Sequence, residues 1–199
     1  MADLEKTGKN LEGRGFRVHR FASGAEAAEF LVQTLHGTSI GIGGSVTIDT
    51  LGVYDRLCGS NEVFWHWKNH APETRERAGK AETYLCSANG VSENGEIVNI
   101  DGFGNRVDGT IYGPERVFLV VGRNKIAPDL TGAIDRARNI AAPLNARRLN
   151  RHTPCAVGEP RCHDCRSPEK VCGVMTVFFM PPTSIKEFHV ILVDEDLGY

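Results

Sequence analysis

The sequence predicts an α/β protein with a mixed, mostly parallel sheet, helices on both faces and an antiparallel hairpin excursion. Apolar runs of strand length recur along the chain and alternate with segments that have helical spacing of apolar residues. These runs, clearest at 116–122, are continuously apolar, which is typical of parallel strands covered on both faces. Segment 90–100 instead carries Asn94-Gly95 between two short runs, which indicates a hairpin with a type I′ turn.

The first half of the chain alternates strands with helices. A strand is expected over 16–21, followed by a helix whose start is marked by Ser23 and Glu26, the spacing of a capping box. A buried strand then runs into Ile42, and after a glycine turn apolar residues keep helical spacing from 48 to 57. Apolar runs at 62–66 and 83–87 predict two further strands.

The second half repeats this order. After the strand at 116–122, helical spacing continues through 130–140, and Pro143 predicts the end of this helix because proline lacks an amide hydrogen and clashes with the preceding turn. Apolar runs at 173–179 and 188–193, separated by two prolines, predict the last two strands.

Composition indicates one domain over residues 1–199. Of the 199 residues 41% are hydrophobic, which is enough to bury a core, and no repeat or linker divides the chain. The formal net charge of −2 gives no general attraction to nucleic acid or an anionic membrane, so an anionic ligand must be bound locally. The apolar runs are shorter than the roughly 18 residues of a spanning helix, so we expect a cytoplasmic protein without a membrane span.

The glycine turn at 41–45 joins a predicted strand to a predicted helix. Glycine lets the backbone approach a ligand, and amides at a helix start favour an anion. The candidate ligand-binding residues here are Gly43, Gly44, Ser45 and Thr47. The alternative is a tight connection that needs glycine only for its backbone angles. The turn lacks the G-x-G-x-x-G spacing of dinucleotide sites, so no nicotinamide cofactor is expected.

A second candidate site is the polar segment 89–106. Arg106 offers a planar fork for a carboxylate or phosphate, and Glu93 or Asp101 is a candidate catalytic nucleophile or base. Turn chemistry is the alternative explanation for so many Gly, Asn and Asp residues. Ligand crevices form at the carboxyl ends of strands. The further candidate ligand-binding residues in this segment and after strand 116–122 are Asn89, Asn99, Gly104, Asn105, Asn124 and Lys125.

The third candidate is a cysteine-rich loop at 152–173 with spacing C-x6-C-x2-C-x6-C. The predicted metal ligands are Cys155, Cys162, Cys165 and Cys172. Four thiolates can hold zinc or an iron-sulfur cluster, and redox-active or unliganded thiols are the alternatives. The spacing fits neither a zinc ribbon nor a ferredoxin, so the metal remains open, with His152 and His163 as spare ligands.

Two smaller features have structural explanations. Cys58 and Cys86 stand alone in apolar surroundings, and we expect both to be small buried side chains. His66 and His70 lie beside Trp65 and Trp67, where an aromatic cluster is the simpler interpretation than a metal site.

The motifs together resemble the LUD family, the lactate utilization protein C type domain. The resemblance covers essentially the whole chain and rests on these segments: "GIGGSVT", "SANGVSENGEIVNIDGFGNRV", "GPERVFLVVGRNKI", "RNIAAPLNARRL", "PCAVGEPRCHDC" and "VILVDEDLGY". It implies a NagB/RpiA/CoA-transferase-like fold and a role near the oxidation of L-lactate to pyruvate. Relatives serve as a component of an iron-sulfur-dependent complex, which implies iron-sulfur partner subunits and leaves homo-oligomer formation open.

Three functions follow from the resemblance and the motifs. The first is a lactate or 2-hydroxy acid utilization component that binds a small anionic metabolite, such as lactate, pyruvate or a phosphate-bearing ligand. The second is an acyl transferase, because "SENG" is similar to the segment in which class I CoA transferases carry a catalytic glutamate, here Glu93. The third is a metabolite-binding module that senses metal or redox state.

Overall fold

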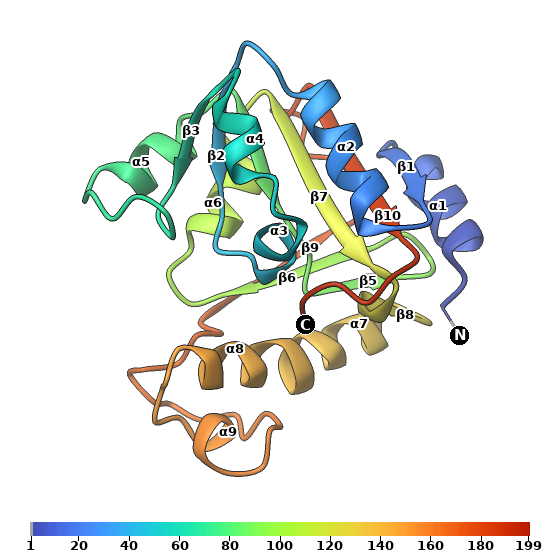
Figure 1. Ribbon diagram of the computed structural model, residues 1–199. Helices are drawn as coiled ribbons and strands as arrows, with labels where there is room; N and C mark the ends of the chain where they lie inside the picture. The colour runs from blue at the N-terminus through green and yellow to red at the C-terminus, as the bar shows by residue number, and fades with distance from the viewer. Residues whose placement is uncertain (1) are drawn as a thin grey trace.

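The computed structural model describes residues 2–199 and contains two sheets. The first has six strands that all pair in parallel, in the order β1-β10-β7-β4-β2-β3 (Figure 1). Its strands are β1 (Arg17–Phe21), β2 (Ser39–Ile42), β3 (Glu62–Trp65), β4 (Thr83–Cys86), β7 (Arg116–Gly122) and β10 (Glu187–Val193).

The second sheet has the order β8-β5-β6-β9 and is mixed. Within it β5 and β6 form the predicted hairpin, β9 is antiparallel to β6, and β8 is parallel to β5. The α/β class with a mostly parallel sheet is therefore confirmed, and the hairpin excursion builds a sheet of its own. The strands are β5 (Gly90–Ser92), β6 (Ile97–Asp101), β8 (Ile126–Ala127) and β9 (Val174–Phe178).

The hairpin turn differs from the type I′ turn that Asn94-Gly95 predicted. A type I′ turn needs positive φ at both central residues, and within residues 2–199 Asn94 is not among the positive-φ residues, whereas Gly95 has φ +90°. The amide of Gly95 donates to the Ser92 carbonyl at 2.9 Å, and the amide of Ser92 donates to the Glu96 carbonyl at 2.8 Å. This is a three-residue loop in which only the glycine needs the left-handed conformation.

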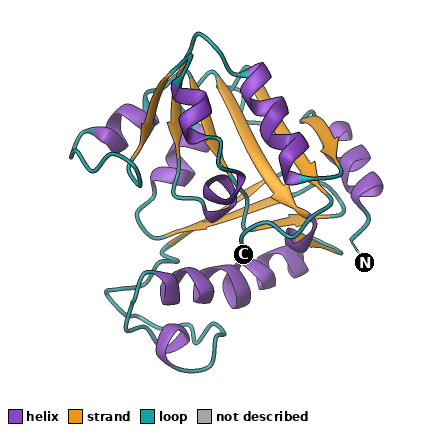
Figure 2. Ribbon diagram, viewed as in Figure 1, coloured by secondary structure: helices purple, strands orange, loops and turns teal. Residues whose placement is uncertain are grey.

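Helices cover both faces of the parallel sheet (Figure 2). Along β7, Phe118 and Val120 belong to a core with α2, α3 and α4, whereas Leu119 and Val121 belong to a core with α1 and the second sheet. The helices α5 and α6 lie on this second face. Gly109 of α6 packs against Tyr84, which belongs to the second core, and Gly41, which faces α5, alternates along β2 with Ile40 and Ile42 of the first core. The helices are α1 (Leu4–Gly13), α2 (Gly24–Thr34), α3 (Val46–Leu51), α4 (Tyr54–Cys58), α5 (Thr74–Gly79) and α6 (Asn105–Ile111).

The outer face of the second sheet is covered by one long helical segment. It comprises α7 (Leu130–Arg136), a π-helical turn η2 (Ala137–Ala141) and α8 (Ala142–Arg148), and Val98 and Ile100 of β6 pack against its alanines. After it comes the short helix α9 (Pro154–Val157). No helix of residues 2–199 has the length and apolar character needed to cross a membrane.

Two helix boundaries differ from the sequence predictions. Pro143 does not end its helix, because the Ala142 amide bonds five residues back to Ala137 in the π-helical turn and Pro143 then falls in the first turn of α8, where no amide is needed. The segment 48–57 is broken into α3 and α4 by Gly52, which has φ +63°. The Ser23 cap is confirmed, with the Glu26 amide donating to Ser23 Oγ at 3.2 Å.

A glycine in β2 sets how closely α5 approaches the sheet. A Cβ added at Gly41 would lie 1.9 Å from the backbone oxygen of Ala78 in α5. Because backbone cannot move aside as a flexible side chain does, this position requires glycine, and the adjoining strand end of β2 is fixed by the same contact.

Candidate functional site

A cleft of about 830 Å³ opens at the carboxyl ends of the parallel strands. Its lining includes residues from the segments that follow β2, β3, β4, β7 and β10, together with residues of α8 and of the cysteine-rich loop. Ligands of open α/β sheets bind at this edge. The cleft lies where the sequence placed the candidate site.

Eight of the predicted site residues line the cleft and five do not. Seven Lys and Arg side chains and three carboxylates line it in all. The predicted residues in the lining are Gly44, Ser45, Thr47, Asn89, Asp101, Asn105, Arg106 and Lys125. Those outside the lining are Gly43, Glu93, Asn99, Gly104 and Asn124.

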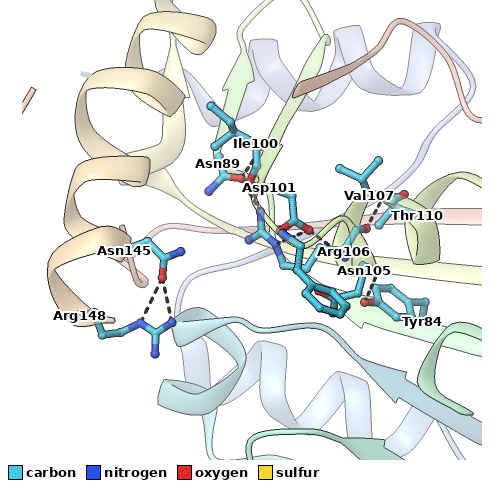
Figure 3. A network of polar contacts seen from close by, with 11 residues as sticks. Tyr84, Asn89, Ile100, Asp101, Asn105, Arg106, Val107, Thr110, Asn145 and Arg148 are labelled. Atoms are coloured by element: carbon cyan, nitrogen blue, oxygen red, sulfur yellow. Dashed lines mark hydrogen bonds and ion pairs between the residues drawn. The ribbon is translucent and has the colours of Figure 1, made fainter. Parts of the chain in front are cut away.

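Arg106, in the first turn of α6, is fixed at the cleft by three groups (Figure 3). Its Nη2 donates to Asn89 Oδ1 and to the Ile100 carbonyl, both at 2.7 Å. The Asp101 carboxylate accepts from the backbone amide of Arg106 at 2.9 Å and lies 3.8 Å from its Nε. Asp101 therefore both orients α6 and partly balances the guanidinium, whose remaining donors are available to a ligand.

Lys125 lies at the floor of the cleft and is only 3% exposed. Its Nζ donates to Thr47 Oγ1 at 2.7 Å and to Ser87 Oγ at 2.8 Å. Each hydroxyl in turn donates a hydrogen bond to a backbone carbonyl, Thr47 to that of Leu197 and Ser87 to that of Val120. No carboxylate of residues 2–199 pairs with the amine. Burial, then the charges of nearby arginines, lowers the pKa of Lys125 to about 7.

A third cation, Arg136 of α7, is buried beside these two. Its Nη1 donates to the Asn89 carbonyl at 2.5 Å and its Nε to the Asn124 carbonyl at 2.7 Å, so backbone oxygens alone satisfy it. Burial lowers its pKa to about 10. Sequence reasoning missed Arg136, and the one available signal was a cation on the apolar side of a helix, next to Ala133 and Ala137.

Asn89 connects these groups. Its side-chain oxygen accepts from Arg106 and from the Ile100 amide at 2.9 Å, and its carbonyl accepts from Arg136. The residue thus positions two guanidinium groups from different helices. Arg106, Lys125 and Arg136 are close enough to influence one another's charge, and within residues 2–199 only Arg106 of the three pairs with a carboxylate, that of Asp101. A ligand anion would balance the excess positive charge.

The rim of the cleft carries groups that sequence reasoning did not single out. Arg148 of α8 donates to Asn145 Oδ1 at 2.8 Å (Figure 3). It also donates to the Tyr199 hydroxyl at 2.7 Å. Its guanidinium also lies 4.5 Å from the ring centroid of Trp67. The ring of Trp67 stacks on Trp65 at 5.6 Å, so the predicted aromatic cluster is present. Through Trp67 the cluster contacts the Arg148 cation at the cleft rim.

Among the five predicted residues outside the cleft, Glu93 is the most informative. It lies in the hairpin turn, where its carboxylate is 3.0 Å from Lys6 Nζ and accepts from the Asp3 amide at 3.1 Å. These contacts lower its pKa. The geometry gives no support to Glu93 as a nucleophile in this cleft. The neighbouring Asn94 and Gly95 form the hairpin turn.

Three of the other four residues outside the cleft, namely Asn124, Gly43 and Gly104, pack against or position neighbouring segments. Asn124 binds the C-terminal segment, donating to the Gly198 carbonyl and accepting from the Leu197 amide, each at 3.1 Å. Asn99 is fully buried in β6, and its side-chain nitrogen and oxygen have no hydrogen-bond partner among residues 2–199. Gly43 is packed against Cys86 and Tyr84, and Gly104 has φ +98° at the start of α6.

The four cysteines of the 152–173 loop are partly buried and lie near one another. Burial and the charges of the other three raise the pKa of the Cys172 thiol, and Cys162 Sγ accepts from Arg138 at 3.4 Å. As they lie, no three Cys, His, Asp or Glu side chains of residues 2–199 form a group able to hold a metal ion. Residues 168–171 of this loop line the cleft, and residue 171 packs against Gly102.

The other two cysteines differ from each other. Cys86 is buried in β4 as expected, and burial raises its pKa. The expectation for Cys58 is wrong, because this residue is exposed at the end of α4, where the preceding Leu57 takes the buried position.

Comparison with known proteins decides the family. A family model described as the LUD domain matches residues 4–193. This chain belongs to the LUD domain family. The assignment confirms the resemblance drawn from the motifs, and LUD domains are associated with lactate utilization. A search of curated proteins found no match to the chain.

The fold of this LUD domain is similar to that of a solved DUF162 family protein from Deinococcus radiodurans. The two share 13% sequence identity with a TM-score of 0.55, over 96% of this chain and 95% of the other. At this identity the similarity concerns the fold alone.

Proposed function

We propose that this LUD domain acts in lactate utilization by binding a small 2-hydroxy or 2-oxo carboxylate, such as lactate or pyruvate, in the cleft. The observation that carries the proposal is the charge imbalance at the cleft floor. Arg106 and Lys125 line the cleft and Arg136 is buried behind the lining, and within residues 2–199 Asp101 pairs with Arg106 alone among the three. Because an unbalanced buried charge is costly, a ligand carboxylate that pairs with these cations is strongly favoured.

The alternative ligand is a phosphate-bearing metabolite. The cleft volume of about 830 Å³ exceeds what lactate fills, and Lys68, Arg148 and Lys170 add positive charge nearer the rim. A phosphate group would use the same cations, since a guanidinium pairs with carboxylate and phosphate alike. The binding experiment therefore includes both ligand classes.

Isothermal titration of the purified protein with L-lactate, pyruvate, inorganic phosphate and coenzyme A tests this proposal. We expect pyruvate or lactate to bind, and Arg106→Met to weaken that binding by tenfold or more, because a charge-assisted hydrogen bond contributes about 1.5–3 kcal/mol. The matched control is Arg56→Met, which removes an arginine paired with Glu29 on the far face of the sheet. Equal affinity in wild type and Arg106→Met, or no carboxylate binding at all, would contradict the proposal.

We further propose that the cysteine-rich loop binds zinc or an iron-sulfur cluster, as a cytoplasmic component that works with iron-sulfur partner subunits. Four thiols in one loop support this, and Arg138 donates a hydrogen bond to the sulfur of one of them, Cys162, at 3.4 Å. Because the sulfurs do not form a ligand set as they lie, metal binding requires the loop to rearrange.

Metal and sulfide analysis of protein purified without oxygen tests this second proposal. Zinc at full occupancy indicates a structural site, and iron with sulfide indicates electron transfer. Cys162→Ser is expected to lower the metal content, whereas Cys58→Ser, which removes an exposed cysteine outside the loop, should leave it unchanged. Metal-free protein from anaerobic cells would refute the proposal.

A further inference from the structure

The amine of Lys125 has the features of a nucleophile. It is buried, it belongs to the lining of the cleft, and its hydrogen-bond partners within residues 2–199 are two hydroxyl groups, without a carboxylate. We propose that Lys125 forms a reversible imine with the carbonyl carbon of a 2-oxo acid bound in the cleft. This inference rests on the proposed function and adds a covalent step that simple anion binding does not require.

The surroundings of Lys125 favour the neutral amine that such a step needs. Lysine becomes nucleophilic when it is desolvated and lies near other cations. Both conditions hold, because burial is the largest cause of the lowered pKa and the charges of Arg136 and Arg106 are the next two. With a pKa of about 7, a large fraction of the amine is uncharged at neutral pH.

Imine formation between the amine and the carbonyl group releases water and needs neither an oxidant nor a cofactor. The nitrogen lone pair attacks the carbonyl carbon, forming a C–N bond and leaving the oxygen as a hydroxyl after proton transfer from nitrogen. Loss of this hydroxyl with a second proton releases one water molecule and leaves a C=N bond. Thr47 and Ser87 each lie within 2.8 Å of Nζ and can carry these protons, because a hydroxyl both donates and accepts.

Arg106 is suited to hold the carboxylate of the same ligand. Its guanidinium is oriented by Asn89 and Asp101 and is close enough to Lys125 to lower the pKa of the amine. A 2-oxo acid carries its carboxylate on the carbon next to the carbonyl. One ligand can therefore pair with the guanidinium and present its carbonyl carbon to the amine, which is the arrangement that favours attack.

Borohydride trapping with peptide mass spectrometry tests the imine. Wild-type protein is incubated with pyruvate and sodium borohydride, digested, and analysed for a lysine that carries the reduced adduct. We expect the adduct at Lys125, no adduct when lactate replaces pyruvate because lactate has no carbonyl to attack, and none at this position in Lys125→Arg. The exposed Lys186 serves as the internal control for unselective reductive alkylation. Lys186→Arg should leave the labelling of Lys125 unchanged.

Titration of pyruvate in the same buffer separates the two proposals. Binding of pyruvate without an adduct at Lys125 would overturn the imine and leave the proposed function intact. Adduct formation at Lys186 to the same extent as at Lys125 would also overturn the imine, because it would show no selectivity. Absence of both binding and adduct would overturn both proposals.

Discussion

Replacing Lys125 by methionine is expected to stabilise the protein at neutral pH while it removes the proposed function. Methionine has a similar length and no charge, so it fills the same space. The hydroxyls of Thr47 and Ser87 keep their bonds to backbone carbonyls, so the variant leaves neither hydroxyl proton without an acceptor.

The expected magnitude follows from the pKa of Lys125, which is 10.5 in the unfolded chain and about 7 in the folded protein. Each pKa unit corresponds to about 1.4 kcal/mol, so keeping this lysine in the fold costs about 4 kcal/mol at pH 7. Loss of its two hydrogen bonds offsets about 1–2 kcal/mol of the gain. We expect Lys125→Met to raise the free energy of unfolding by about 2–3 kcal/mol at pH 7.

The pH dependence of the free energy of unfolding provides a control for this prediction. Between pH 7 and pH 10.5 the unfolded chain binds the lysine proton more strongly than the folded protein does, so wild-type stability rises with pH in this window. Urea unfolding at pH 7 and pH 9 should show a gain of about 2 kcal/mol in wild type beyond that in Lys125→Met. Lys186→Met, at an exposed lysine, should follow wild type at both pH values. A less stable Lys125→Met with an unchanged pH slope would refute the reasoning.

Three further predictions concern stability, each measured by urea unfolding. Burial lowers the pKa of His189 from 6.5 to about 4. Between pH 6.5 and pH 4 the unfolded chain therefore binds more protons than the folded protein, and the free energy of unfolding falls by about 3 kcal/mol as the pH drops through this range. His189→Phe should reduce this dependence on pH, and the same pH dependence in variant and wild type would contradict the assignment. Gly41→Ala should lose about 3 kcal/mol or more, since its Cβ meets the Ala78 oxygen, whereas Gly13→Ala, with open space around it, should lose nothing; equal effects would exclude the packing argument. Ser23→Ala should lose about 1 kcal/mol through its helix cap, and an unchanged midpoint would show that the cap contributes nothing.

The edge of the sheet that carries the site could be predicted from the sequence, because strand order and polarity constrain it. Ser45, Asn89 and Lys125 each follow a strongly apolar run, and parallel strands bring their carboxyl ends to one edge. Gly44 was found for the same reason, since it lies in the connection from β2 to α3, whereas Arg106, in the first turn of α6, was found from the polar composition of segment 89–106.

Residues whose role depends on partners distant in the chain could not be predicted. The hairpin at Asn94-Gly95 could be predicted, but the role of Glu93 in its turn could not, because the ion pair with Lys6 depends on the packing of α1 beside the hairpin. In the sequence Arg136 resembles any arginine of a helix, because its hydrogen bond to the Asn89 carbonyl depends on how α7 packs against a distant part of the chain. Pro143 signals a helix end by its local chemistry, but the π-helical turn that accommodates it is set by packing on the second sheet.

The placement of the C-terminal segment affects how the protein should be prepared. Asn124 and Thr47 hold residues 197–198 beside Lys125, and Tyr199 lies in the cleft lining. An affinity tag fused after Tyr199 would therefore sit at the mouth of the cleft and compete with small ligands. A tag fused before α1 lies beside the hairpin turn instead, so binding measurements should use that form or a cleaved one.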